Sequence, residues 1–141
     1  MDIRPATTDD DIRACFPVMR ELRPHLDEAA FLAQAKRQMA NHGYALVALH
    51  DDGRICAVAG YRVAEFLAWG KALYIDDLVT AAAVRKAGHG GALLDWLEGQ
   101  AKTLGCAQLH LDSGVQRHDA HRLYLGRKLA ITSHHFAKPL S

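Results

Sequence analysis

A glycine-rich segment in the second half of the chain constrains the fold more than any other feature. Residues 85–91 read Arg-Lys-Ala-Gly-His-Gly-Gly, and they join a strand-like stretch at 71–79 to a helical pattern. The apolar face of that helix consists of Leu93, Leu94, Leu97, Ala101 and Leu104. The first N–H groups of a helix have no intrahelical partner, and they carry the positive end of the helix dipole. Because glycines let an anion approach those groups closely, the segment predicts a diphosphate site.

Two common diphosphate loops do not match this segment. A P-loop needs a Lys-Ser/Thr pair after its glycines, and the dinucleotide fingerprint needs a third glycine where Leu93 stands. The dinucleotide motif also belongs to an early βαβ unit, whereas this loop follows predicted antiparallel strands. A glycine-rich turn that only lets a helix and a strand pack closely remains the alternative.

The first half of the chain predicts a strand, two helices and a β-hairpin. In order, we expect a strand at 3–6, helices that begin after Thr8 and Asp27, and strands at 44–50 and 54–66. Pro17 lies inside the first helix and predicts a kink there. Gly43 ends the second helix, and Asp52-Gly53 is a typical hairpin turn.

The second half predicts strands alternating with helices. We expect a strand at 71–79, the helix after the glycine segment, a strand at 108–112, a helix at 118–127 and a strand at 131–137. Trp69-Gly70 marks a chain reversal, and Gly105 ends the long helix. A strand–helix–strand crossover makes 108–112 parallel to 71–79. This order of elements predicts an α/β layer fold around one mixed sheet.

The glycine segment and the strand before it carry a family resemblance. Arg85, Gly88 and Gly90 form the pattern Arg-x-x-Gly-x-Gly, and Leu-Tyr-Ile-Asp-Asp-Leu-Val-Thr at 73–80 lies just upstream. This resembles the GNAT superfamily of N-acetyltransferases, whose acetyl-CoA pyrophosphate loop reads Gln/Arg-x-x-Gly-x-Gly/Ala. The resemblance covers residues 1–141 and implies a single N-acetyltransferase domain. It also implies a mixed, mostly antiparallel sheet with splayed fourth and fifth strands, flanked by about four helices.

The resemblance implies acetyl-CoA as co-substrate and assigns residues to it. The pyrophosphate loop would comprise Arg85, Lys86, Ala87, Gly88, His89, Gly90 and Gly91. Leu78, Val79 and Thr80 would hold the pantetheine arm and the acetyl group, and a backbone N–H there would polarise the thioester carbonyl. Arg117 stands where the family often has Asn, and it could instead contact a CoA phosphate.

The resemblance also implies catalytic residues for direct attack of an amine on the thioester. Asp76 and Asp77 lie where the family often carries acids, which act as a base through water or bind the ammonium group. Strand alternation sends the two to opposite faces unless a bulge intervenes, so we expect one of them to line the acceptor site. Tyr124, in Ala120-His-Arg-Leu-Tyr124, would be the general acid that protonates the leaving thiolate. Lys128 departs from the family at a position that often has positive φ, which costs about 1 kcal/mol or forces a different turn.

Charge and composition limit the class of acceptor molecule and the cellular compartment that we expect. The formal net charge of +1 gives no electrostatic footprint for nucleic acid or for an anionic membrane, and it argues against polycationic protein acceptors. No signal peptide or membrane-spanning stretch is visible. Three widely spaced cysteines favour reduced thiols in the cytoplasm. We therefore expect a cytoplasmic enzyme that acetylates a primary amine of a small molecule.

Several alternatives remain open. A non-catalytic acyl-CoA sensor on the same fold, or a protein N-terminal or lysine acetyltransferase, would carry the same loop. Nine histidines raise a metal-binding alternative, but no ligand motif accompanies them and we expect no metal. Arg20, Arg23 and His25 form a cationic patch that would suit an acceptor bearing a carboxylate or a phosphonate, or they form a solvated helix end. Phe66 and Trp69 could stack on a substrate or make a contact in a homodimer.

Overall fold

We describe the fold from a computed structural model, which describes residues 1–85 and 87–141. Lys86, one of the predicted loop residues, lies outside the described part. The chain divides into two compact units, Met1–Leu111 and Asp112–Ser141, and each is described by itself.

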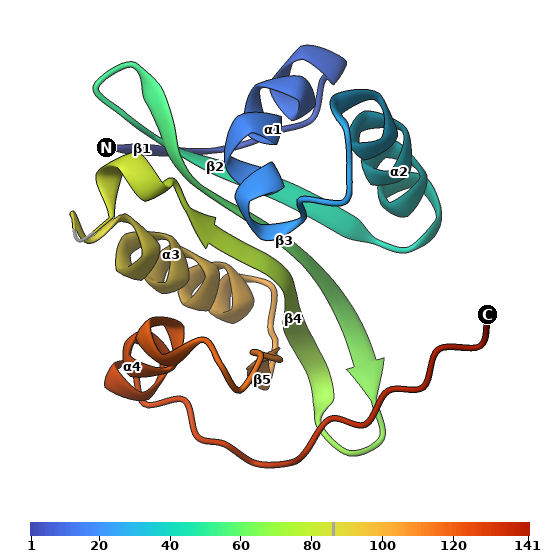
Figure 1. The fold of residues 1–141 in the computed structure, drawn as a ribbon. Coiled ribbons are helices and arrows are strands. Elements are labelled where there is room, and N and C mark those ends of the chain that lie inside the picture. Colours follow the sequence, from blue (N-terminus) through green and yellow to red (C-terminus); the bar gives the residue numbers. More distant parts are fainter. Residues whose placement is uncertain (86) are drawn as a thin grey trace. The chain divides into compact units, whose positions relative to one another are not determined.

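The first unit is built on one five-stranded sheet with strands in chain order (Figure 1). The strands are β1 (Asp2–Pro5), β2 (Tyr44–Asp51), β3 (Arg54–Phe66), β4 (Gly70–Thr80) and β5 (Gln108–Leu111). Each pair from β1 to β4 is antiparallel, and β5 lies parallel to β4. The sheet is therefore mixed and mostly antiparallel, which confirms the predicted fold class.

Helices α1 (Asp9–Leu22) and α2 (Glu28–Asn41) begin at the predicted caps. Thr8 accepts a hydrogen bond from the Asp11 N–H, and Asp27 accepts one from the Ala30 N–H, so each cap satisfies an otherwise unpaired donor. Gly43 follows α2 with φ 66°, the left-handed conformation that glycine adopts without strain. Helix α1 continues through Pro17, and the kink expected there stays a prediction.

The two faces of the sheet carry different helices, as Figure 1 shows. Helices α1 and α2 pack on one face through a buried cluster that includes Phe16, Met19, Phe31, Leu46 and Val58. Helix α3 (His89–Thr103) covers the other face, and its Leu93, Leu94 and Leu97 are almost fully buried. A short 3-10 turn at Ala82–Val84, which the sequence did not predict, connects β4 to the glycine segment.

The second unit contains one helix, α4 (His118–Gly126), where the sequence predicts one. Lys128 has φ 66°, so the predicted left-handed turn is present with a lysine in it. The predicted strand at 131–137 is wrong: residues 129–141, all of them described, contain no strand. A strand requires a ladder of hydrogen bonds to a neighbour. This segment is solvated instead, with Ile131 and Phe136 at 80% and 93% exposure, and Pro139 has no N–H to donate.

Candidate acetyl-transfer site

A β-bulge in β4 determines where the two candidate acids point. Gly60 of β3 pairs with Asp77, whereas the next residue, Tyr61, pairs with Ile75, so Asp76 is an extra residue in β4. Before the bulge, Tyr74 faces α1 and α2; after it, Asp77 does. The alternation thus changes phase at Asp76, and both carboxylates line the same pocket. Alternation alone would have sent only one of the two to this side of the sheet, and the bulge is the reason that both lie here.

The pocket lies between α1, α2 and the sheet and has a volume of about 390 Å³. This is near the lower end of the roughly 300–1,000 Å³ that is typical of small-molecule sites. Its polar lining consists of Arg23, His25, Gln34, Gln38, Tyr44, Tyr74, Asp76 and Asp77, and its apolar lining consists of Met19, Leu26, Phe31 and Ala35. Arg23 and His25, two of the three residues in the predicted cationic patch, therefore belong to the site.

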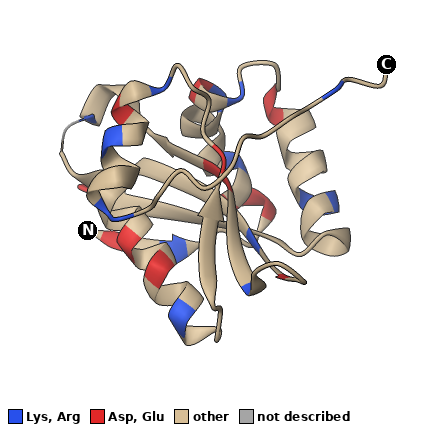
Figure 2. Cartoon of the chain, turned by 90° about the horizontal axis from the view of Figure 1, so that it is seen from below, with Lys and Arg blue, Asp and Glu red and all other residues tan. Residues whose placement is uncertain are grey.

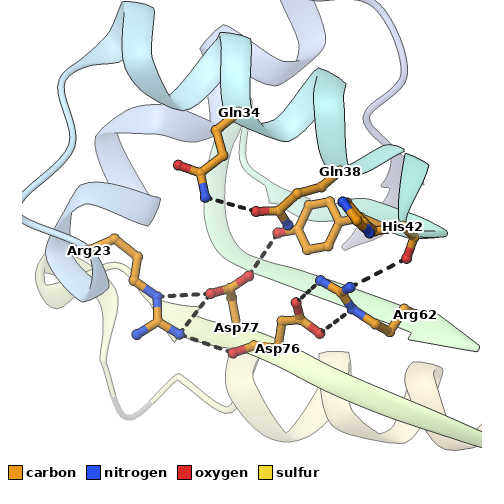
Figure 3. Close-up of polar contacts among 8 residues, drawn as sticks. Arg23, Gln34, Gln38, His42, Arg62, Asp76 and Asp77 are labelled. Carbon is orange, nitrogen blue, oxygen red and sulfur yellow. Dashed lines mark hydrogen bonds and ion pairs between the residues drawn. The ribbon is translucent and has the colours of Figure 1, made fainter. Parts of the chain in front are cut away.

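Asp77 is held by donors on both of its oxygens (Figure 3). The Arg23 Nε donates to Oδ1 at 2.9 Å, and the Tyr44 hydroxyl donates to Oδ2 at 2.8 Å. Arg23 Nη2 also donates to the Asp76 carbonyl at 3.0 Å, which ties the last turn of α1 to the bulge. Asp77 is only 13% exposed, so these two side chains, rather than bulk water, supply most of the polar contacts of its carboxylate.

Asp76 is paired with a different arginine. Arg62 Nε donates to Oδ1 at 3.0 Å, and Arg62 Nη2 donates to Oδ2, which makes a bidentate ion pair. The hydrogen bond to Asp76 raises the pKa of Arg62 above its ordinary value. Arg62 also approaches the carbonyl of His42 at the end of α2, as Figure 3 shows.

Tyr44 and Arg62 are site residues that the sequence alone did not reveal. Tyr44 pairs with Arg62 across β2 and β3, and its hydroxyl lies directly over Gly60. A Cβ on Gly60 would be 1.8 Å from that hydroxyl oxygen, so only glycine fits there. A glycine inside a strand often marks such a close approach, and Gly60 was the one available signal.

The predicted pantetheine residues lie on β4 where its pairing with β5 has ended. The β4–β5 ladder runs from Ala72–Gln108 to Ile75–Leu111, and Leu78, Val79 and Thr80 follow the bulge. Among the described strands, only β3 pairs with this end of β4. Within the sheet, this leaves the β5 side of Leu78, Val79 and Thr80 without a paired strand, and a ligand arm would need such an edge.

The glycine segment begins α3, and within residues 1–85 and 87–141 no side chain caps this helix. Gly88 has φ 83°, and the first turn contains no acidic residue. Space is open around Gly88, since a Cβ there would meet no atom within 4 Å. By contrast, α1 and α2 are capped by Thr8 and Asp27. The backbone of Ala87, Gly88, Gly90 and Gly91 and the side chain of Arg85 remain candidates for the pyrophosphate.

The side chain of His89 has another partner. It is 4% exposed, and its Nε2 lies 2.9 Å from Asp51 Oδ2 at the end of β2. That contact lowers the pKa of Asp51 below its ordinary value. His89 therefore fixes the start of α3 to the β2–β3 hairpin, and only its backbone N–H is a candidate for binding a phosphate.

Tyr124 and Arg117 lie in the second unit. Tyr124 is buried on α4, and burial raises its pKa above the ordinary value, although the neighbouring Arg117 works in the opposite direction. The phenol is consequently protonated at neutral pH, as a general acid must be. Arg117 immediately precedes α4.

Two of the nine histidines, His110 and His121, and the aromatic residue Trp69 have local partners. His121 Nε2 lies 2.9 Å from the Gly114 carbonyl, and Trp69 stacks on His110 at 3.5 Å. Among the residues that the structure describes, no group of three potential ligands could hold a metal ion. Within the same part of the chain, no helix is long and apolar enough to cross a membrane.

Comparison with known proteins identifies the family to which this chain belongs. A profile of the Acetyltransferase (GNAT) family matches residues 7–128. An uncharacterized N-acetyltransferase of Bacillus subtilis (strain 168), YhdJ, is 34% identical over 139 residues, which make up 98% of each chain.

Solved structures of low sequence identity share the fold. A transcriptional regulator from Bacillus halodurans C-125 has a TM-score of 0.86 at 19% identity, over 99% of both chains. The aminoglycoside N-acetyltransferase AAC(6')-Iy, in complex with CoA, has a TM-score of 0.84 at 14% identity, over 99% of this chain and 95% of its own. Because the family profile matches most of the chain and the bacterial relative matches 98% of it, the chain belongs to the GNAT family of acetyltransferases and is an acyltransferase.

Proposed function

We propose that this enzyme transfers the acetyl group of acetyl-CoA to a primary amine of a small molecule, with residues 1–141 acting as one catalytic domain. The bulge at Asp76 carries the proposal. It brings two carboxylates into a pocket of small-molecule size on the strand that parts from β5. We place the reaction in the cytoplasm, because Cys15, Cys56 and Cys106 are all free thiols.

The uncapped start of α3 and the free edge of β4 would bind acetyl-CoA. The backbone around Gly88 and Gly90, together with Arg85, suits a pyrophosphate because it offers N–H groups and positive charge, and the first turn of α3 contains no acidic residue. The backbone of Leu78, Val79 and Thr80 would hold the pantetheine arm. The CoA complex of AAC(6')-Iy, which has the same fold, supports this choice of co-substrate.

The chemistry needs one proton removed and one supplied. An ammonium group must lose a proton before its nitrogen can form the C–N bond, and the sulfur must gain one as the C–S bond breaks. Asp77 is the better candidate to bind the ammonium and accept its proton through water. One of its oxygens is held by a neutral hydroxyl, whereas Arg62 occupies both oxygens of Asp76. Tyr124 would supply the proton to sulfur.

Amine-dependent release of CoA from acetyl-CoA tests the proposal. The wild type should release CoA in the presence of small primary amines. Asp77→Asn should lower kcat/KM for the amine roughly 100-fold, the lower range for loss of a general base, while acetyl-CoA still binds. Asp10→Asn, which changes an exposed aspartate on α1, is the matched control. Wild-type protein that binds acetyl-CoA but releases no CoA with any amine would favour the acyl-CoA sensor instead.

A further inference from the structure

The charges around the acceptor pocket cancel within the protein. Asp77 is paired with Arg23 and Asp76 with Arg62, so two carboxylates face two guanidinium groups (Figure 3). His25 is the other ionisable cation-forming side chain in the lining. The pocket therefore offers no net negative charge to an incoming ligand. Acidic and basic residues are spread over the whole chain, as the red and blue segments in Figure 2 show. Helix α1, for example, begins with Asp9, Asp10 and Asp11 and carries Arg20 in its last turn.

This balance disfavours acceptors with several positive charges. A partly buried site stabilises a ligand whose charge complements its own, and like charges brought together in it repel. A polyamine or an aminoglycoside would bring more than one ammonium to a pocket whose two carboxylates are already paired with arginines, and no unpaired carboxylate among the described lining residues would receive the second. An acceptor with no net charge fits the pocket better.

One nitrogen of the Arg23 guanidinium group, Nη1, does not donate a hydrogen bond to Asp77 or to Asp76. Its Nε and Nη2 bind Asp77 and the Asp76 carbonyl, while Nη1 makes no hydrogen bond or ion pair with the part of the chain that the structure describes. Figure 3 shows Nη1 pointing away from both carboxylates. The side chain is 40% exposed and lines the pocket. A guanidinium with a free edge is well suited to bind a carboxylate.

We propose that the acceptor is an amine that also carries a carboxylate close to it, the class to which free amino acids belong. The Arg23–Asp77 pair would bind both groups, with the ammonium on Asp77 and the carboxylate on Arg23 Nη1. Arg23 and Asp77 are in direct contact, so one small acceptor that carries both groups can reach the two side chains together. The inference rests on the proposed acetyl transfer and names the substrate of that reaction.

The rest of the pocket would receive the remainder of such a molecule. Gln34 and Gln38 of α2 bind each other at 3.0 Å, and each keeps a further donor or acceptor for a polar side chain. Leu26 and Phe31 supply apolar surface beside them. A volume of about 390 Å³ accommodates an amino acid but restricts larger acceptors.

A panel of matched amines tests the proposal on the full-length enzyme with acetyl-CoA. Each amino acid, for example leucine, is compared with its amide, with the corresponding amine that lacks the carboxylate, and with kanamycin as a polycation. We expect kcat/KM to be highest for amino acids, and about tenfold or more above the amides, which is the effect of one charge-assisted hydrogen bond. Amides or simple amines that equal their parent amino acids, or a preference for kanamycin, would overturn the proposal.

Variants of Arg23 connect that preference to the pocket. Arg23→Gln should remove the preference for amino acids over amides, and Arg23→Lys should restore part of it. Arg13→Gln removes another α1 arginine that pairs with an aspartate, but it lies outside the pocket and should keep the wild-type ratio. An unchanged ratio in a folded Arg23→Gln enzyme would overturn the assignment. A wild type that binds acetyl-CoA but acetylates no amine would instead count against the proposed function itself.

Discussion

Tyr44 shows how single atoms set the geometry of the pocket. Its hydroxyl donates to Asp77 at 2.8 Å and occupies the space that a side chain at position 60 would fill. Burial, together with the charge of Asp77, raises the pKa of Tyr44 far above its ordinary value. The hydroxyl is therefore protonated at neutral pH, where it donates a hydrogen bond that fixes one oxygen of Asp77.

Tyr44→Phe should lower kcat/KM for the amine about tenfold and leave the Kd of acetyl-CoA unchanged. A hydrogen bond to a charged group contributes roughly 1.5–3 kcal/mol, and here one donor to Asp77 would be lost. Gly60→Ala should have a similar effect by displacing the hydroxyl. Steady-state kinetics and calorimetry measure the two quantities. Tyr61→Phe is the control, because Tyr61 packs on Trp96 on the other face of the sheet. An equal loss in that control would contradict the role given to Tyr44.

Lys128 carries backbone strain that glycine would relieve. Its φ of 66° is left-handed, which costs a residue with a side chain roughly 1 kcal/mol. Lys128→Gly should raise the free energy of unfolding by about that amount in denaturant titrations. Lys128→Ala removes the same charge without relieving the strain, so a gain of equal size in both variants would show that charge, not conformation, is responsible.

At the scale of elements, the bulge in β4 was the feature that sequence reasoning left undecided. The sequence located the strand, the acids and the possibility of a bulge, but a bulge depends on the register between two strands. That register is set by packing on both faces of the sheet, including Tyr44 over Gly60. Local sequence signals were enough to predict where α1 and α2 begin, because Thr8 and Asp27 each accept a hydrogen bond from the backbone N–H three residues later.

The capping box of α1 predicts a specific response to acid. The backbone N–H groups of Thr8 and Thr7 lower the pKa of Asp11 below its ordinary value of 3.8. Its stabilising effect is therefore complete above that ordinary value and is lost as pH falls through the lowered pKa of the folded state. Asp11→Asn should destabilise the protein at neutral pH, and the difference from wild type should fade in acid.

Thermal unfolding followed across that pH range measures the difference. Thr8→Ala, which removes the other half of the capping box, should cost about 1 kcal/mol at neutral pH. A difference between wild type and Asp11→Asn that stays constant into acid would contradict the account of the cap.

At the scale of the whole molecule, the order of elements was predictable up to α4. Periodicity and turn residues are local properties, and they identified five strands and four helices near their observed positions. The predicted strand at 131–137 failed because apolar residues alone do not create a strand; a partner edge must be available. The sequence also could not predict that Arg23 contacts Asp76 and Asp77, because Arg23 is more than 50 residues away from them along the chain.

The central claim is that acetyl-CoA binds at the glycine-rich start of α3. Calorimetric titration with acetyl-CoA, comparing wild type with Gly90→Glu, tests it most directly. We predict micromolar binding to the wild type and its loss in a folded Gly90→Glu protein, because a side chain and a negative charge would obstruct the pyrophosphate. A well-folded wild type that does not bind acetyl-CoA, or equal binding by the variant, would contradict the claim.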